Sequence, residues 1–207
     1  MKLGLFGGTF DPIHNGHLSM AAAFADELAL DQVVFIPAGD PYHKSVATRT
    51  PAAKRMAMVE AAIASDVRFA ASDIDMVREG ATYTVDTLQI LRQYYPNAEI
   101  WWLMGMDSLL SMHTWHRYQD IFKLANVAVA ARNDEKIQQV APEMRALVAQ
   151  GLSQATSASK GQLRLLQWQP EDISSTQIRN AVKSGLTIDG WVPKPVRDYI
   201  STHGLYR

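Results

Sequence analysis

The sequence predicts an α/β fold in which a doubly wound parallel sheet carries helices on both faces. Short apolar runs alternate with longer amphipathic stretches along the chain, an order that is typical of β-α-β units. Apolar residues make up 47% of the chain and charged residues 20%, which is ordinary for a globular protein. The length of 207 residues is enough for one domain with a well-buried core.

The first half of the chain predicts three strands, each followed by a helix. Apolar side chains recur at helical spacing from Leu18 onwards, and Pro37 stops the second strand. We expect Thr50 to cap the second helix, with Met56, Val59 and Ile63 on its buried face. The predicted strands are 2–6, 32–37 and 67–72, and the predicted helices are 17–28, 50–65 and 84–95.

The second half of the chain predicts three more strands and two closing helices. The strands are 99–105, 126–132 and 162–168, and the helices are 174–185 and 193–204. The stretch 133–161 is polar and rich in Gln and Ala, which indicates a peripheral variable segment. We therefore expect a single domain over 1–207, with a Rossmann-like sheet and a small C-terminal helical part.

The overall composition excludes several classes of protein. There is no cysteine, so disulfides, thiolate metal sites and a cysteine nucleophile are ruled out. The formal net charge of -1 gives no sign of a nucleic-acid or acidic-membrane partner. No apolar run approaches the roughly 20 residues that span a bilayer, and no secretory leader is evident. We therefore expect a cytoplasmic protein without nucleic-acid or membrane partners, and the oligomeric state is left open.

Glycines and polar side chains are concentrated between the first predicted strand and the first predicted helix. Gly7 and Gly8 end the strand, and His14 and His17 flank Gly16 at the start of the helix. Ligands of open parallel sheets bind beyond the carboxyl ends of strands, near a helix N-terminus that favours phosphate. The glycine spacing matches neither G-x-G-x-x-G nor a P-loop. We expect the glycines to leave room for a ligand and both imidazoles to donate to phosphate oxygens.

Plainer interpretations of this stretch are solvated surface histidines, metal ligands and a simple glycine turn. No acidic residue completes an H-E-x-x-H pattern, and no cysteine is available as a ligand. The stretch GGTFDPIHNGHL resembles the signature of the nucleotidylyltransferase superfamily, whose H-x-G-H motif is met by residues 14–17. Members of that superfamily join a nucleoside triphosphate to a phosphorylated acceptor and release pyrophosphate, so the resemblance implies this class of reaction without naming the acceptor.

Two further loops follow predicted strands at the same edge of the sheet. In PAGDPYHKS, Lys44 is either a surface lysine or a point charge for an acceptor phosphate, and Arg49 is a second cation nearby. In LMGMDSL, Gly105 allows close approach of a ligand. Asp107 is either a helix cap or an acceptor for a ribose or amide. Trp115 is either packed core or a flat face for an aromatic ring.

Two helix starts carry more polar groups than capping requires. Residues 82–84 (TYT) precede one helix, and one threonine is enough for an N-cap. Ser174, Ser175 and Thr176 start another helix, with Arg179 one turn further along. Hydroxyl groups, free backbone N–H groups and a guanidinium at a helix start suit a triphosphate.

Together these segments resemble the family of bacterial nicotinate-nucleotide adenylyltransferases along nearly the whole chain. The matching segments are GGTFDPIHNGHL, PYHK, TYTVDTL, GMDSL with the later Trp115, ISSTQIR and YISTHGLY. Tyr42 stands where a proline is frequent in the family, and Thr82 where a serine is frequent.

The resemblance implies that the 5′-phosphate of nicotinate mononucleotide attacks the α-phosphorus of ATP, giving deamido-NAD and pyrophosphate. It implies Mg²⁺ carried by ATP rather than by a protein cage. The catalytic residues that it implies are His14, His17, Lys44 and Arg179. Those for ATP are Gly7, Gly8, Thr9, Phe10, Gly105, Ser175 and Thr176. Those for nicotinate mononucleotide are Arg49, Thr82, Tyr83, Thr84, Asp107 and Trp115.

Two alternatives remain. The acceptor could be nicotinamide mononucleotide or phosphopantetheine, although the TYT segment and Trp115 favour a flat ring over a pantetheine arm. A non-catalytic nucleotide-binding module would be expected to lack at least one of the four catalytic positions, and all four are present.

Overall fold

The computed structural model describes residues 1–39, 50–131, 134–154, 159–168 and 173–207. Within these ranges six parallel strands form one sheet in the order β3-β2-β1-β4-β5-β6. The predicted fold class and all six predicted strands are confirmed. The strands are β1 (Lys2–Gly8), β2 (Gln32–Pro37), β3 (Phe69–Ala71), β4 (Glu99–Gly105), β5 (Asn126–Ala131) and β6 (Leu163–Gln167).

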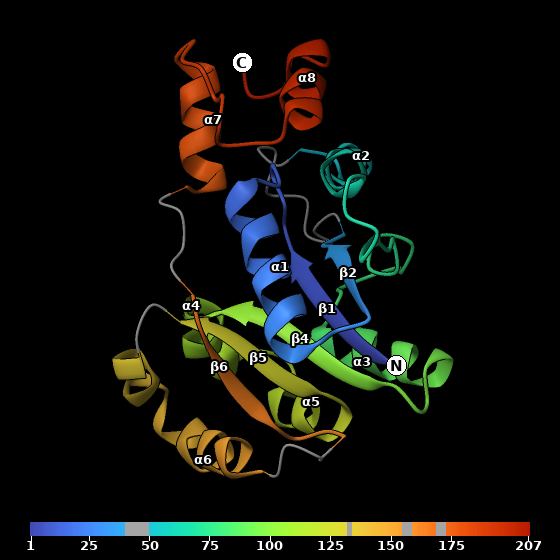
Figure 1. Cartoon of the computed structure of the whole chain (residues 1–207), viewed down its shortest axis with the longest axis vertical. Helices are drawn as coiled ribbons and strands as arrows, with labels where there is room; N and C mark the ends of the chain where they lie inside the picture. Colours follow the sequence, from blue (N-terminus) through green and yellow to red (C-terminus); the bar gives the residue numbers. More distant parts are fainter. Residues whose placement is uncertain (40–49, 132–133, 155–158, 169–172) are drawn as a thin grey trace.

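Helices cover both faces of this sheet (Figure 1). They are α1 (Asn15–Leu28), α2 (Ala52–Ile63), α3 (Thr84–Tyr94), α4 (Met106–Ser111), α5 (Tyr118–Leu124), α6 (Arg145–Ser153), α7 (Ser175–Lys183) and α8 (Lys194–Thr202). Short 3₁₀ turns are η1 (Met112–Thr114), η2 (Asp134–Gln139) and η3 (Pro142–Met144). In the part of the chain that the structure describes, no helix is both long and apolar enough to cross a membrane.

Each face of the sheet has its own hydrophobic core. Phe6, Phe24 and Phe35 lie in the core beneath α1, α2, α7 and α8. Leu5 and Trp102 point to the opposite face, into the core that α3, α4 and α5 cover. Successive side chains of a strand point to opposite faces, so strands covered on both sides are apolar throughout, as the central strand sequences are.

The chain reverses its direction of travel across the sheet between β1 and β4. These two strands are neighbours at the centre, and the chain moves outwards to β3 in its first half and to β6 in its second. A crevice at such a topological switch point is the usual ligand site of an open α/β sheet. Figure 1 shows α7 and α8 beyond the carboxyl end of β1, so the C-terminal helices lie at this edge of the sheet.

The second helix departs from the prediction in two respects. Its N-cap is Pro51 rather than Thr50, because Pro51 has a non-helical ψ of 142° and its carbonyl accepts the first hydrogen bonds of the helix, from the N–H groups of Lys54 and Arg55. Its buried face contains Val59 and Ile63 as predicted, but Met58 rather than Met56 is fully buried. The packing of α2 against the sheet and α8 selects this face.

Candidate active site

A cavity of about 240 Å³ lies at the switch point, between the carboxyl ends of β1 and β4. Backbone from both strands, the first helix and the segment after α4 contribute to its wall. Its lining includes Gly7, Gly8, Phe10, His17, Gly105 and Trp115. Six of the sequence-predicted positions therefore lie around one cavity at the place where this fold binds ligands.

The glycines do not all leave open space. An added Cβ at Gly105 would meet nothing within 4 Å, in keeping with close approach of a ligand. At Gly7 it would lie 2.7 Å from the Trp102 ring, and at Gly8 2.7 Å from the Phe10 ring. Two aromatic rings therefore fill the space on the Cβ side of Gly7 and Gly8, whereas both glycines also line the cavity.

His14 and His17 form a stacked pair at the N-terminus of α1. His14 is the N-cap residue, and its backbone N–H donates to Nδ1 of His17 at 3.3 Å. The two ring centroids lie 3.7 Å apart. This is one half of a capping box, with a histidine in place of the usual Glu or Gln; within the described residues, the His14 side chain makes no cap hydrogen bond in return. Both imidazoles therefore lie together at the start of the helix.

The accepted hydrogen bond fixes the tautomer of His17. Because Nδ1 accepts a hydrogen bond from the His14 backbone N–H, the neutral ring must carry its own proton on Nε2. The ring edges pack against Phe10, with centroids 5.1 Å apart, and against Phe6 at 6.2 Å. His17 is therefore held as a neutral donor in an apolar setting, at a helix N-terminus that favours anions.

Burial keeps both imidazoles uncharged near neutral pH. It lowers the pKa of His14 to about 4. Burial, and secondarily the charge of His14, lowers the pKa of His17 to about 3. Among the described residues, Nδ1 of His14 is buried and has no hydrogen-bond partner. A buried polar atom without a partner is unusual and points to a ligand or water as its partner.

The depressed pKa values predict how stability varies with pH. Unfolded histidines titrate near 6.5, so below that pH the unfolded chain binds more protons than the folded chain. Stability therefore rises with pH across this window. The contribution is complete above about pH 6.5 and is lost as the pH falls through about 4 and about 3.

Urea unfolding at pH 7 and pH 5 measures this effect. The His17→Asn variant should lose less stability between the two pH values than the native chain, whereas the same change at His203, which is exposed on the surface, should leave the difference unaltered. Equal losses in the native chain and His17→Asn would contradict the burial of a neutral imidazole.

The N-terminus of α7 lies against the loop that precedes the histidines. Ser175 Oγ donates to the Pro12 carbonyl at 2.9 Å, and Arg179 Nη1 donates to the Asp11 carbonyl at 2.7 Å. Arg179 also donates to Thr176 Oγ1 at 3.1 Å. Ser175 and Arg179 thus join the start of α7 to the backbone of the loop before the histidines.

Sequence reasoning missed Asp11. Its carboxylate is 5% exposed and accepts hydrogen bonds from the Tyr206 hydroxyl at 2.6 Å and from the Thr50 backbone N–H at 3.2 Å. The quoted motif contains Asp11, and the closing segment contains Tyr206. Nothing in either segment alone shows that residues 195 positions apart are in contact.

Arg55 was also missed. Its side chain is completely buried on α2. It donates to the carbonyls of Thr9 at 2.8 Å, Ala38 at 2.6 Å and Thr50 at 2.9 Å. One guanidinium therefore ties together the segments after β1 and β2 and the start of α2. The available signal was an arginine within an apolar helix face, since arginine is rarely buried without partners.

The residues predicted for the acceptor are divided between several places. Trp115 is half-buried and lines the central cavity. Tyr83, at the start of α3, is 41% exposed and its ring lies 4.3 Å from that of His116. This contact brings the Thr82–Thr84 segment beside the Trp115 segment. Asp107 is exposed in the first turn of α4, and Lys44 and Arg49 lie outside the described residues.

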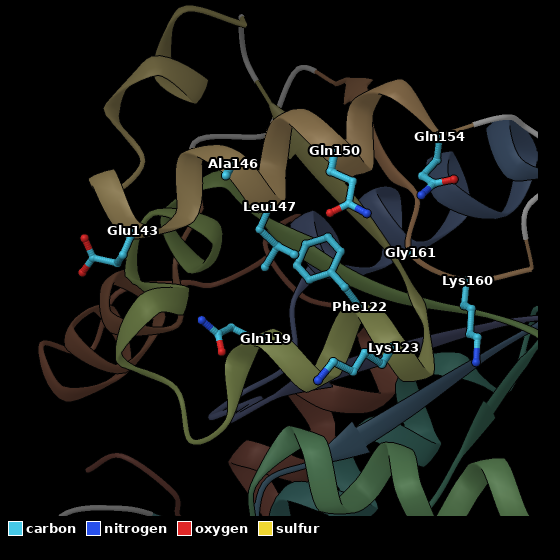
Figure 2. A pocket seen from close by; sticks show the side chains of 10 residues that line it. All are labelled: Gln119, Phe122, Lys123, Glu143, Ala146, Leu147, Gln150, Gln154, Lys160 and Gly161. Carbon is cyan, nitrogen blue, oxygen red and sulfur yellow. The ribbon is translucent and has the colours of Figure 1, made fainter.

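Two further cavities do not contain any of the predicted site residues among their lining residues. One, of about 340 Å³, lies beyond β2 and is lined by Gly39, Ala52, Ala53, Asp75, Met76, Arg78 and Gly80. The other, of about 590 Å³, lies between α5, α6 and Lys160–Gly161 (Figure 2). Its wall combines Gln and Lys side chains with Phe122 and Leu147. The stacked histidines belong to neither cavity.

The chain is similar to a known class of proteins both in sequence and in fold. The family model described as cytidylyltransferase-like matches residues 5–181, which include the H-x-G-H motif and the start of α7. A solved structure of nicotinic acid mononucleotide adenylyltransferase from Plasmodium falciparum, complexed with NaAD, has the same fold, with a TM-score of 0.74 and 14% identity over 99% of this chain and 97% of that chain. The chain is therefore a member of the cytidylyltransferase-like class.

Closer relatives narrow the class to one family. A protein named probable nicotinate-nucleotide adenylyltransferase from Neisseria meningitidis serogroup C is 52% identical over 99% of this chain and 98% of its own length. A protein of the same name from Chromobacterium violaceum is 42% identical over all of this chain and 99% of its own length. The chain belongs to the nicotinate-nucleotide adenylyltransferase family.

Proposed function

We propose that this protein transfers the adenylyl group of ATP to nicotinate mononucleotide, giving deamido-NAD and pyrophosphate in NAD biosynthesis. The observation that carries the proposal is the stacked pair of His14 and His17 at the switch-point cavity, held at a helix N-terminus. The choice of acceptor is supported by the names of the relatives, which are called nicotinate-nucleotide adenylyltransferases. These relatives match this chain over nearly their whole length.

The reaction requires little acid–base chemistry from the protein. An oxygen of the mononucleotide 5′-phosphate, already an anion at neutral pH, attacks the α-phosphorus of ATP. The bond from that phosphorus to the bridging oxygen breaks, and pyrophosphate leaves. Catalysis then consists of positioning and of stabilising the charge that develops on the phosphoryl oxygens.

His17 is the residue that we assign to the α-phosphate. Its Nε2–H donates as the charge on the α-phosphate oxygens grows, and the dry, apolar setting strengthens that hydrogen bond. His14 lies beside it and serves the adjoining part of the triphosphate. An anion bound against either ring favours the protonated imidazole, so we expect the pKa of both histidines to rise when ATP binds.

The start of α7 is the part of the protein that we assign to the β- and γ-phosphates. Ser175, Thr176 and Arg179 already lie beside the loop that leads to the histidines. The free N–H groups at the N-terminus of a helix bind anions without further charge. Arg179 adds a guanidinium, which suits phosphate oxygens through paired hydrogen bonds.

Magnesium belongs to the substrate in this proposal. Within the described ranges no group of three or more His, Cys, Asp or Glu side chains is arranged to hold a metal ion. A Mg²⁺ ion carried by the triphosphate keeps several of its waters and needs few protein ligands. ATP would lie in the cavity lined by Gly7, Gly8, Phe10 and Gly105, with Thr9 next to it in the sequence.

We assign the residues that bind nicotinate mononucleotide by matching their side chains to its pyridine ring, its ribose and its phosphate. Trp115 offers the ring a flat face beside the cavity, and the segment Thr82–Thr84 offers hydroxyl and backbone donors. Asp107 would accept a hydrogen bond from a ribose hydroxyl, and Lys44 and Arg49 would neutralise the mononucleotide phosphate.

We further propose that 1–207 forms a single domain, with 133–161 as a peripheral variable segment.

Pyrophosphate release with MgATP tests the choice of acceptor. We expect nicotinate mononucleotide to exceed nicotinamide mononucleotide by more than about tenfold in kcat/KM, because a carboxylate presents two acceptor oxygens to backbone donors where a carboxamide presents one oxygen and one NH2 donor. Phosphopantetheine is the third substrate in the same assay. Equal rates with the two pyridine mononucleotides would replace this proposal with a dual-specificity enzyme. Release with phosphopantetheine alone would overturn it.

A further inference from the structure

The loop between β1 and α1 is held in a conformation that it would not adopt unaided. Phe10 has a φ of 49°, in the left-handed region that side chains with a Cβ rarely enter. Its ring is nevertheless buried, edge-on against His17 with centroids 5.1 Å apart. Strained residues of this kind persist only where their surroundings over-determine them.

Several separate contacts fix this loop. Arg55 holds the Thr9 carbonyl, Arg179 the Asp11 carbonyl and Ser175 the Pro12 carbonyl. The Asp11 carboxylate joins the loop to the C-terminal segment, because it accepts a hydrogen bond from the Tyr206 hydroxyl. Each backbone contact fixes one carbonyl oxygen, whereas the carboxylate is held from two directions, by Tyr206 and Thr50.

The backbone conformation and the surroundings of Tyr206 both fix the position of its hydroxyl. Its φ of 65° is also left-handed, and its neighbour Leu205 is buried in the core beneath α8. Burial, together with the Asp11 carboxylate, raises the pKa of the Tyr206 phenol, so the hydroxyl keeps its proton and donates at neutral pH. A short hydrogen bond from a hydroxyl to a carboxylate is among the stronger kinds in proteins.

We propose that Asp11 and Tyr206 are positioning residues for adenylyl transfer. The Tyr206 hydroxyl holds the Asp11 carboxylate, this pair fixes the loop, and the loop keeps Phe10 against His17. The inference rests on the proposed function, because its consequence is the placement of His17 at the α-phosphate. It also gives the C-terminal segment a part in the active site, although Tyr206 lies outside the lining of the cavity.

The test compares Tyr206→Phe with Tyr199→Phe. Both changes remove one phenolic hydroxyl from the C-terminal region, but Tyr199 lies on α8 with its ring stacked on His203. We expect Tyr206→Phe to lower kcat by about ten- to a hundredfold with the KM for ATP nearly unchanged, because a small displacement of a group that acts on the transition state slows the chemical step. Tyr199→Phe should retain the native kcat.

Histidine titration by nitrogen NMR supplies a readout that does not depend on turnover. In Tyr206→Phe, the pKa of His17 should rise from about 3 towards the ordinary value as Phe10 loosens. Asp11→Asn should lower kcat to a similar degree. The kcat of the double variant, Asp11→Asn with Tyr206→Phe, should lie within about twofold of the kcat of the slower single variant. The reason is that the two residues act as one unit.

The outcomes separate this inference from the proposed function. A native kcat in Tyr206→Phe overturns the inference, and so does an unchanged His17 titration, which would reduce Tyr206 to a contributor to stability. If the native protein does not form deamido-NAD, the proposed function fails. A shifted His17 titration in Tyr206→Phe would then still show that the pair places the histidine.

Discussion

Replacing His17 with alanine is expected to lower kcat by about 10² to 10³, equivalent to about 3–4 kcal/mol of transition-state stabilisation. The ring is a fixed neutral donor, since His14 N–H occupies Nδ1 and leaves the proton on Nε2. A preorganised donor in an apolar site acts on the charge of the transition state without first having to reorganise. The KM for ATP should change much less than kcat, because the interaction strengthens only as the phosphoryl charge develops.

His203→Ala is the matched control for this measurement. His203 is exposed at the end of α8 and its ring stacks on Tyr199. The control should retain native kcat and KM. A loss of less than about tenfold in a folded His17→Ala variant would remove His17 from the role that we assign to it.

Replacing Arg55 with methionine is expected to lower the free energy of unfolding by about 3 kcal/mol or more. The methionine fills much of the same volume, but the carbonyls of Thr9, Ala38 and Thr50 lose their donor inside the protein. Each buried acceptor without a partner costs about 1–3 kcal/mol. Urea unfolding with circular dichroism measures the change.

Arg68→Met is the matched control, because Arg68 is an arginine whose partners lie at the surface. It is paired with Asp26 and Asp66, and exposed pairs contribute about 1 kcal/mol or less. If Arg55→Met were no more destabilising than Arg68→Met, the buried guanidinium would not be holding these loops together. Activity of the Arg55 variant should also fall, since the Thr9 carbonyl belongs to the loop that places Phe10.

The fold could be predicted because its signals are local. The strands are short apolar runs, and Pro37 and Gly105 mark the ends of two of them. The helices between them have the length that parallel strand connections require. The His14–His17 pair is also local, since three residues at a helix start already determine that both rings share one end of α1.

The residues that sequence reasoning missed depend on distant contacts. The partner of Asp11 lies 195 positions away in the chain, and that of Arg55 at Thr9 lies 46 positions away. The hydrogen bond from the Thr50 backbone N–H to the Asp11 carboxylate likewise joins residues 39 positions apart. Hydrogen bonds of this kind follow from tertiary packing, which neither hydrophobic period nor motif spacing encodes.

The surroundings of Gly7 and Gly8 also depend on tertiary packing that the local sequence does not reveal. A glycine pair at the end of a strand indicates that something approaches the backbone closely. It does not say whether a ligand or another side chain does so. Here the rings of Trp102 and Phe10 approach the Cβ side of the two glycines, which also line the cavity, and Phe10 in turn packs against His17. The glycines thus contribute to the histidine site through packing.

The central claim is that the α-phosphorus of ATP is the atom attacked, and labelled ATP tests it most directly. With phosphorus-32 in the α position, the label should appear in deamido-NAD when nicotinate mononucleotide is the acceptor. With the label in the γ position, it should appear only in pyrophosphate. Transfer of the γ label to the mononucleotide, or release of the α label without a dinucleotide, would contradict the account.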